Sequence, residues 1–185
     1  AMKSAKLKVL FDEYTNCAKG DLHKARKQIV FGKGSENAQI VLLAEAPGKN
    51  EDEQGLPFVG QAGKMLDKMI QAMGLKTEDV YILNSCLCRP PNNRKPTAGE
   101  IAACSDRLHK QLDIIQPKVI VALGASAAEA LLGPGGSLAS RRVAWHSYRD
   151  IPVRVTYHPA ALLYNASQKP AAAEDLKQVL AFLES

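Results

Sequence analysis

The sequence predicts an α/β protein with three α/β/α layers around a central four-stranded parallel sheet. Short apolar runs recur along the chain, and most are followed by a segment with helical periodicity. This alternation of strand and helix is typical of a parallel sheet that is covered on both faces. The chain has 185 residues, of which 46% are hydrophobic, and this is enough for one sizeable core. We therefore expect a single domain over residues 1–185, in which residues 1–38 form a basic helix and a cysteine-containing loop.

Four apolar runs are predicted to be the strands. The first three have no charged position, as expected for strands that are buried on both faces of a parallel sheet. In chain order the four strands are residues 40–43, 80–83, 119–123 and 153–156. Each of them is preceded or followed by turn-forming residues, which supports the assignment of short strands.

The helices are predicted from apolar side chains at helical spacing, most clearly in residues 62–73. Thr97 and Glu100 have the spacing of a capping box, so a helix is expected to begin there. The predicted helices are residues 3–16, 62–73, 97–115, an alanine-rich segment ending at 132, and 171–183. Residues 89–96 are expected to be a loop because of their prolines and asparagines, and residues 133–142 a flexible, basic loop.

The net charge of +5 is concentrated at the amino end. Residues 1–33 contain eight lysines and arginines against three acidic residues, and the rest of the chain is balanced. A basic end is suited to contact with a nucleic-acid backbone, although a solvated helix face explains it equally well. The chain has no apolar run long enough to cross a membrane and no apolar signal core, so we expect a cytoplasmic monomer with no membrane partner.

Chemically useful side chains follow the predicted strands. Glu45 follows the first strand, Asn84 ends the second, and His158 follows the fourth. The carboxyl ends of parallel strands converge on one crevice, where ligands bind. A carboxylate there can orient or deprotonate water, and a histidine can donate to a developing oxyanion. Taken singly, each of these residues is also explained as a capping acid, a turn-forming asparagine or a structural histidine.

Phe58 lies between turn residues in the segment 55–60. An aromatic ring in such a turn can stack on a planar base, and the amide of Asn84 can bind the polar edge of a pyrimidine through its donor and its acceptor. The alternative for Phe58 is a place in the hydrophobic core.

The four cysteines are Cys17, Cys86, Cys88 and Cys104. In a cytoplasmic chain they are not expected to form a disulfide framework. Fe–S clusters are usually held by four thiolates, and Cys17 begins a C-x-x-C spacing that is broken by Gly20. From the residues alone the cysteines are buried thiols, metal ligands or both.

Taken together, these segments resemble family 4 of the uracil-DNA glycosylase superfamily, its iron–sulfur branch. The resemblance extends from about residue 17 to residue 180. Its motifs are residues 45–48, 55–64, 84, 88–91, 104, 117–124 and 157–163. So many segments in the same order make a highly specific signal.

The resemblance implies a DNA repair enzyme that hydrolyses the N-glycosidic bond of deoxyuridine in single- and double-stranded DNA. The products would be uracil and an abasic site, and the deoxyuridine would first be flipped out of the duplex. Phe58 would stack on the uracil, Asn84 would read its polar edge, and His158 would stabilise charge on its O2. Ala46 would also lie at the uracil, at the position where the best-known branch of the superfamily has a water-activating aspartate.

The resemblance also implies roles for residues around this centre. Glu45 would position the water, with Glu51 as a second candidate carboxylate. Leu162 would be the wedge that fills the gap in the base stack. Further DNA contacts are expected from arginines, namely Arg89, Arg141 and Arg142.

The resemblance places the ligands of a [4Fe–4S] cluster at Cys17, position 20, Cys88 and Cys104. Gly20 cannot be a ligand. Three explanations remain: a three-iron or externally ligated cluster, a substitute ligand such as His23 or Cys86, or no cluster. We expect a defective or absent cluster in preference to an intact one, and we expect its loss to affect folding and DNA docking before chemistry.

Two other functions compete with the glycosylase. One is a non-catalytic uracil-DNA binding protein of the same superfamily. A related branch traps uracil-DNA covalently through a histidine on an inserted loop, but residues 89–99 contain no histidine, which argues against trapping. The other is a generic α/β nucleotide-binding domain, which would not require Asn84 and His158 together.

Overall fold

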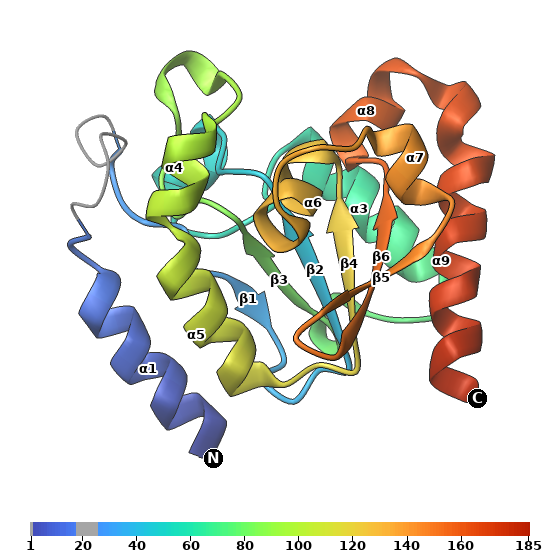
Figure 1. The fold of residues 1–185 in the computed structure, drawn as a ribbon. Coiled ribbons are helices and arrows are strands. Elements are labelled where there is room, and N and C mark those ends of the chain that lie inside the picture. The colour runs from blue at the N-terminus through green and yellow to red at the C-terminus, as the bar shows by residue number, and fades with distance from the viewer. Residues whose placement is uncertain (1, 18–25) are drawn as a thin grey trace.

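The structure is a computed structural model, and it describes residues 2–17 and 26–185. A six-stranded sheet forms its centre, with the strand order β1-β3-β2-β4-β6-β5. Figure 1 shows the strands running side by side between two groups of helices. The strands are β1 (Lys33–Gly34), β2 (Ile40–Ala44), β3 (Tyr81–Asn84), β4 (Val119–Leu123), β5 (Trp145–Tyr148) and β6 (Ile151–Thr156).

The sheet is mixed, so the prediction of a four-stranded parallel sheet needs correction. Strands β3, β2, β4 and β6 pair in parallel, whereas β1 and β5 pair antiparallel at the two edges. Both edge strands were missed because neither has a continuous apolar run. β1 has two residues, and three of the four residues of β5 are exposed or half-buried.

The helices of the described residues lie on both faces of the sheet, as Figure 1 shows. They are α1 (Met2–Tyr14), α2 (Lys49–Gln54), α3 (Gln61–Ala72), α4 (Ala98–Ala103), α5 (Ser105–Ile115), α6 (Ala125–Leu132), α7 (Leu138–Arg142), α8 (Pro159–Tyr164) and α9 (Lys169–Glu184). Over these residues, no helix combines the length and the apolar character that crossing a bilayer requires.

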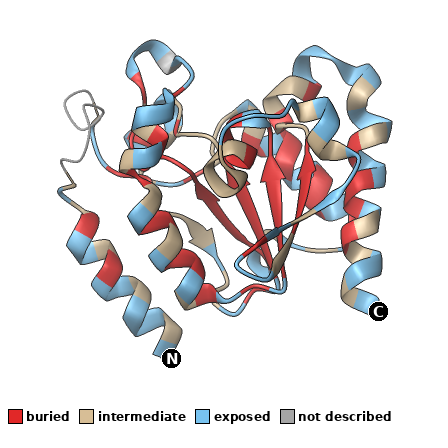
Figure 2. Ribbon diagram, viewed as in Figure 1, coloured by how far each residue is buried: buried red, intermediate tan, exposed pale blue. Residues whose placement is uncertain are grey.

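Two hydrophobic cores form against the two faces of the sheet. On one face, α3, α8 and α9 pack against the strands through residues such as Leu66, Leu162 and Leu176. On the other face, α5 and α6 contribute Leu108, Leu112 and neighbouring residues. The parallel strands β2, β3, β4 and β6 are mostly buried in Figure 2, whereas the helices are exposed on their outer sides. This pattern explains why the parallel strands could be predicted from apolar runs alone.

A third cluster lies at the side of the sheet, where α1 packs against α5. It contains Leu10, Tyr14 and the three buried cysteines. The two helices lie side by side in Figure 1, and the Lys3 Nζ donates to the Ile115 carbonyl oxygen at the end of α5, at 2.7 Å. The amino-terminal helix is therefore present as expected, held through its inward residues.

Several segments differ from the sequence-based prediction. The helix that begins after Thr97 is divided into α4 and α5, with Cys104 between them. The segment 133–142 contains α7, whose amino end is capped by the Ser137 hydroxyl accepting from the Ser140 amide. Helices α2 and α8 were missed because they have six residues each and little room for helical periodicity.

The register of the strands aligns their carboxyl ends. Ala44 at the end of β2 is opposite Asn84 at the end of β3, and Leu123 at the end of β4 is opposite Thr156 at the end of β6. The residues that follow these positions therefore lie at one edge of the sheet, which is the upper edge in Figure 1.

Candidate active site

A cavity of about 310 Å³ lies at the carboxyl edge of the parallel strands. It contains all six residues that the resemblance assigned to uracil and water, although they come from four separate segments. The residues that line it are Glu45, Ala46, Pro47, Gly48, Glu51, Phe58, Ala62, Asn84, Pro90, Arg94, His158 and Ala160. Convergence at this edge is the behaviour expected of an open α/β sheet.

Phe58 is held in a rare backbone conformation beside the cavity. Its φ is +54°, in the left-handed region that few non-glycine residues adopt. Gly63 in the first turn of α3 makes this possible, because a Cβ at Gly63 would lie 2.0 Å from the Phe58 carbonyl oxygen. The ring of Phe58 lies 5.7 Å from the ring of His158, centroid to centroid, and the two planes are inclined by 31°. Backbone strain of this kind is concentrated at functional sites.

His158 is the N-cap of α8, and this contact determines where its proton lies. The Ala160 amide donates to the His158 Nδ1 at 3.0 Å, so Nδ1 carries no proton. Burial lowers the pKa of the imidazole to about 4, so the ring is neutral at physiological pH and its proton is on Nε2. Gly124 at the end of β4 allows the close approach of this residue, since a Cβ there would lie 3.2 Å from the His158 Cβ. The site therefore offers a neutral N–H donor.

Asn84 ends β3 and is 3% exposed. Its side chain lines the cavity, and within residues 2–17 and 26–185 no side chain or backbone group hydrogen-bonds to its amide. A buried polar group is normally satisfied. The amide of Asn84 is therefore available for a polar ligand in the cavity.

The two candidate carboxylates have different surroundings. Glu51 accepts from the Gly48 amide at 3.0 Å, the Val59 amide at 2.9 Å and the Gly60 amide at 3.0 Å. Its carboxylate thus joins the loop after β2 to the loop before α3, which is a structural task. Glu45 is half-buried, and in the described part of the chain its carboxylate has no hydrogen bond or ion pair. Glu45 is therefore the better placed of the two to bind water.

Ala46 follows Glu45 and presents only a methyl group and its backbone to the cavity. An alanine has no group that can activate water. The cavity is thus apolar at this position, and Glu45 is the adjacent carboxylate.

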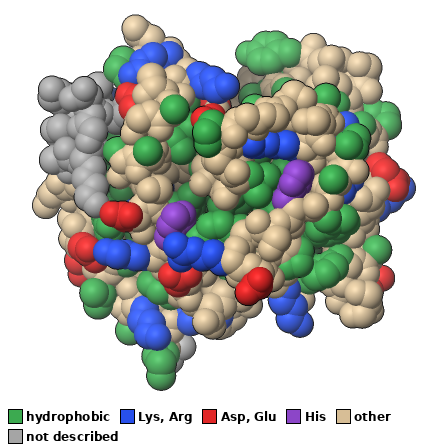
Figure 3. Space-filling model, in the orientation of Figure 1, with side chains coloured by type: hydrophobic (Ala, Val, Ile, Leu, Met, Phe, Trp, Pro, Cys, Tyr) green, Lys and Arg blue, Asp and Glu red, His purple; other side chains and the backbone are tan. Residues whose placement is uncertain are grey.

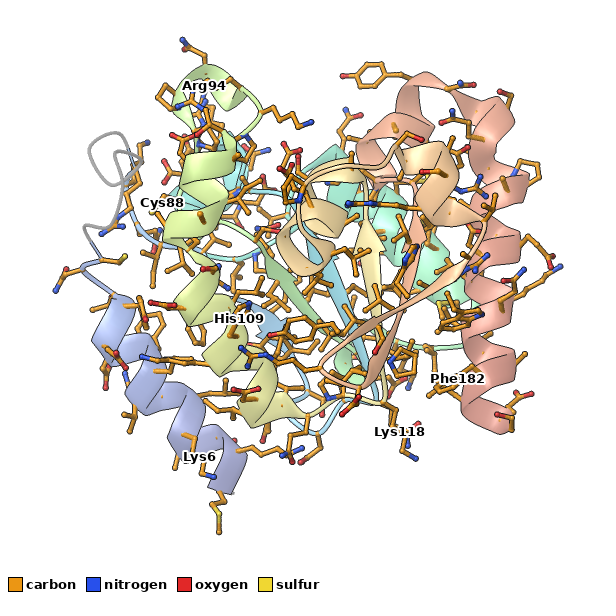
Figure 4. All side chains as sticks on the ribbon, in the orientation of Figure 1. Lys6, Cys88, Arg94, His109, Lys118 and Phe182 are labelled. Carbon is orange, nitrogen blue, oxygen red and sulfur yellow. The ribbon has the colours of Figure 1, made fainter. Side chains whose placement is uncertain are left out.

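Arg94 was not recognised in the sequence as a site residue. It lines the cavity and lies on the loop above α4 in Figure 4. Its guanidinium makes a two-pronged contact with Glu100, at 2.7 Å and 2.8 Å, and this contact lowers the pKa of Glu100 to about 2. The capping box of Thr97 and Glu100 can be recognised in the sequence. It marks Glu100 as a fixed carboxylate, to which a nearby arginine such as Arg94 can bind.

Leu162, the predicted wedge, does not project from the surface. Leu162 is 2% exposed and belongs to the core between α3, α8 and the sheet. A leucine in a packed core cannot enter a base stack without leaving that core. The next two residues of α8 are exposed, Leu163 at 41% and Tyr164 at 91%, because successive helical positions face in different directions.

Arg141 and Arg142, two of the arginines predicted to contact DNA, are bound within the protein. Arg142 Nε donates to Asp175 at 2.9 Å, and its guanidinium lies 4.5 Å above the Tyr157 ring. Arg141 donates to the carbonyl oxygens of Gly133 and Gly135. These contacts fix the loop before α7 and the residue before His158. Arg89 is half-buried.

Basic side chains do not form a single patch on the face drawn in Figure 3. The lysines of α1 lie beside α5, and Lys3 reaches the end of α5 that leads into β4. That end of α5 is at the amino edge of the sheet, opposite the cavity. Lys8 pairs with Asp12 on the same helix at 2.9 Å. The charge of α1 therefore fits the solvated helix face better than a DNA contact at the cavity.

The cysteines gather at the third cluster, next to α5. Cys86, Cys88 and Cys104 are buried and Cys17 is half-buried, and Cys88 lies beside α4 in Figure 4. Arg26 Nη1 donates to the Cys88 Sγ at 2.9 Å. The Cys86 thiol hydrogen-bonds to Cys104 and lowers the pKa of Cys104, whereas burial raises the pKa of Cys88. An anionic sulfur is thus favoured at Cys104 and disfavoured at Cys88.

These thiols do not complete a cluster site. Three of the four family positions are cysteines, but no group of three or more potential ligands in residues 2–17 and 26–185 is arranged to hold a metal ion. Gly20 and His23 lie outside the described residues. The three cysteines offer the soft sulfur donors that iron–sulfur clusters use, but the set lacks the fourth thiolate that the resemblance implies.

Comparison with known proteins agrees with this geometry. The family model of the uracil DNA glycosylase superfamily matches residues 31–183. The chain is 43% identical to a type-4 uracil-DNA glycosylase of Archaeoglobus fulgidus, over 90% of this chain and 88% of that protein. It is 42% identical to one from Saccharolobus solfataricus, over 97% and 87%, and 38% identical to one from Thermotoga maritima, over 96% and 95%. The chain therefore belongs to the uracil-DNA glycosylase superfamily, and within it to the type-4 family.

Proposed function

We propose that this protein is a uracil-DNA glycosylase of DNA repair, which hydrolyses the N-glycosidic bond of deoxyuridine in DNA and releases uracil. The observation that carries the proposal is the neutral His158, whose Nε2–H has no partner among residues 2–17 and 26–185 and which lines a cavity together with Phe58 and Asn84. The names of the type-4 relatives agree with this activity. We expect one glycosylase domain over residues 1–185.

The cavity has the elements needed to recognise a flipped pyrimidine. The ring of Phe58 offers a stacking surface, and stacking of a base on an aromatic ring is worth about 1–3 kcal/mol. The amide of Asn84 offers a donor and an acceptor to N3–H and O4 of uracil. Because this amide has no partner among the described residues, binding uracil does not require a protein hydrogen bond to be broken.

The chemistry follows from the position of the proton on His158. When the bond between C1′ and N1 breaks, its electron pair leaves with uracil and negative charge develops on O2. The Nε2–H of His158 donates to that oxygen, and such a donor typically contributes about 2.7–4 kcal/mol to the transition state. A neutral ring retains this proton throughout, so the charge is stabilised without transfer of the proton.

Glu45 completes the reaction by binding the water. The deoxyribose carries positive charge as uracil departs, and the water oxygen adds to C1′ while one water proton passes to the Glu45 carboxylate or to the uracil anion. A strongly electrophilic sugar needs only an oriented water, so the carboxylate acts mainly by position. Glu51 supports the site by holding the two loops on either side.

Exposed side chains near the cavity are the candidates for contact with DNA. Leu163 and Tyr164 project from α8 next to His158, and they replace Leu162 as candidates for the wedge. Arg94 is placed to bind a phosphate of the flipped nucleotide, because Glu100 holds its guanidinium at the cavity. The remaining N–H groups of a guanidinium that is held in this way can still donate to phosphate.

An iron–sulfur cluster, if it is bound, would be held by Cys17, Cys88 and Cys104 and would have a structural role. None of the three cysteines lines the cavity. The hydrolysis proposed above uses no group from the cysteine cluster. All four cysteines are unpaired, which is in keeping with a reducing compartment such as the cytoplasm.

Excision is tested by incubating the protein with single- and double-stranded DNA that contains one uracil. Alkali-labile cleavage at the uracil is expected, opposite each of the four bases, and no cleavage is expected when thymine takes its place. Intact DNA after long incubation with excess protein, together with retained binding, would instead support the uracil-DNA binding protein.

A further inference from the structure

Arg107 is a buried cation that the catalytic residues do not explain. It lies on α5 and is 1% exposed. In the described residues its charge faces the Cys104 and Cys86 thiols, and no aspartate or glutamate pairs with it. Burying a charge costs several kcal/mol unless the site compensates it. Replacing a buried charged residue by an apolar residue of similar size often leaves the free energy of unfolding unchanged or raises it. Its presence therefore indicates a task that depends on the directions of its N–H groups.

The guanidinium of Arg107 is directed at the end of β3. Its Nη2 donates to the Asn84 carbonyl oxygen at 3.0 Å and to the Ser85 carbonyl oxygen at 2.7 Å. On the other side of this segment, the Ser85 amide donates to the Ala44 carbonyl oxygen at 2.8 Å. The backbone that carries the Asn84 side chain is thus held between β2 and α5.

A second residue of α5 fixes the guanidinium itself. Arg107 Nη1 donates to the Gln111 Oε1 at 3.0 Å. The Gln111 Nε2 donates in turn to the Phe31 carbonyl oxygen at 2.9 Å and to the Tyr81 hydroxyl at 3.0 Å. Tyr81 is the first residue of β3. The network therefore joins the backbone at the end of β3 to the side chain of its first residue. Its orientation is set because a guanidinium can only donate.

We propose that Arg107 is a positioning residue for uracil recognition, which fixes the backbone at Asn84 so that the side-chain amide meets the polar edge of the base. The proposal rests on the proposed function. A lysine at position 107 has a point charge and no planar fork, so it cannot reproduce contacts with two successive carbonyls and a glutamine. A displacement of about 1 Å at a substrate-binding group can cost about 100-fold in rate.

The test is a double-mutant cycle in single-turnover excision of uracil from double-stranded DNA. Arg107→Lys is expected to lower the rate by about 100-fold in the wild-type background. In the Asn84→Ala background it is expected to change the rate by less than about threefold, because the amide that Arg107 positions is absent. Leu108→Ala is the matched control: it removes a buried side chain at the next position of α5 and should have the same effect in both backgrounds.

Equal effects of Arg107→Lys in both backgrounds would overturn the proposal and leave Arg107 with a purely structural role. The side-chain amide of Asn84, followed by NMR in ¹⁵N-asparagine-labelled protein, provides a readout that does not depend on activity. Its resonances should shift in Arg107→Lys and not in Leu108→Ala. A wild-type protein without excision would reject the proposed function, and an unshifted amide would reject the role of Arg107.

Discussion

The rings of Phe58 and His158 lie 5.7 Å apart with their planes inclined by 31°, although Phe58 precedes α3 and His158 follows β6. A base that stacks on Phe58 therefore has its edge next to the imidazole. Phe58 provides the binding surface and His158 provides the donor, so substitutions at the two positions should affect different steps of excision.

Replacing His158 with alanine should lower the single-turnover rate of uracil excision by about 100- to 1,000-fold, because the donor to uracil O2 is lost. The affinity for uracil-containing DNA should change little, because Phe58 and Asn84 remain. Phe58→Ala should mainly weaken binding. Rates and dissociation constants are measured separately, with excess enzyme and by fluorescence anisotropy. An unchanged rate in His158→Ala would remove this residue from the mechanism.

The stability of the protein should depend on pH through His158. Burial lowers the pKa of the folded imidazole to about 4, whereas in the unfolded chain it is about 6.5. As the pH falls, the imidazole of the unfolded state takes up a proton before that of the folded state. The contribution of His158 to the free energy of unfolding is therefore fully present above about pH 6.5 and is lost as the pH falls toward 4. The loss amounts to about 3 kcal/mol.

Urea unfolding between pH 4 and pH 7 measures this effect, with His158→Gln as the control. Glutamine does not titrate, so the pH dependence of the variant should be smaller. His109, whose pKa is also lowered by burial, contributes equally to both proteins. The same pH dependence in the two proteins would show that His158 is not held in the neutral form.

Glu45 and Glu51 should respond differently to replacement by glutamine. Glu45→Gln should lower the excision rate and leave unfolding unchanged, because the Glu45 carboxylate has no partner among the described residues. Glu51→Gln should lower the free energy of unfolding by about 1–3 kcal/mol, because three backbone amides lose a charged acceptor. Urea unfolding and single-turnover kinetics of both variants distinguish these roles, and the reverse pattern would exchange them.

The adjacent residues Leu162 and Leu163 should also separate stability from function. Leu162→Ala should cost about 2–5 kcal/mol of unfolding free energy, because it empties part of the core. Leu163→Ala should leave stability nearly unchanged and lower excision from double-stranded DNA more than from single-stranded DNA, which has no stack to fill. Equal losses on the two substrates would argue against Leu163 as the wedge.

Arg94→Ala should weaken binding to all DNA sequences and reduce the slope of log affinity against log salt concentration by about 1, as expected for one lost phosphate contact. Arg149→Ala is the control, because Arg149 pairs with Asp113 on the surface away from the cavity. Affinities measured between 50 and 200 mM salt give the slope. A slope equal to that of the wild type would exclude a phosphate contact by Arg94.

Local chemistry explains which parts of this protein could be predicted from its sequence. The parallel strands are continuous apolar runs because both of their faces are buried, and Glu45, Asn84 and His158 follow such runs directly. The capping box of Thr97 and Glu100 is likewise a contact between near neighbours. For these features the sequence contains both the element and the position of the side chain within it.

The tertiary structure alone decided the features that depend on packing between distant segments. Leu162 is buried and Leu163 is exposed because α8 packs one of its faces against α3. The Glu51 carboxylate binds backbone amides because two loops meet there. The Arg142 guanidinium binds Asp175 because α9 packs beside it. The sequence determined that a carboxylate, an amide and an imidazole stand at the ends of parallel strands. Which side chains remain free for a ligand depends on long-range contacts, since a hydrogen bond or a buried face is settled only when its partner is in place.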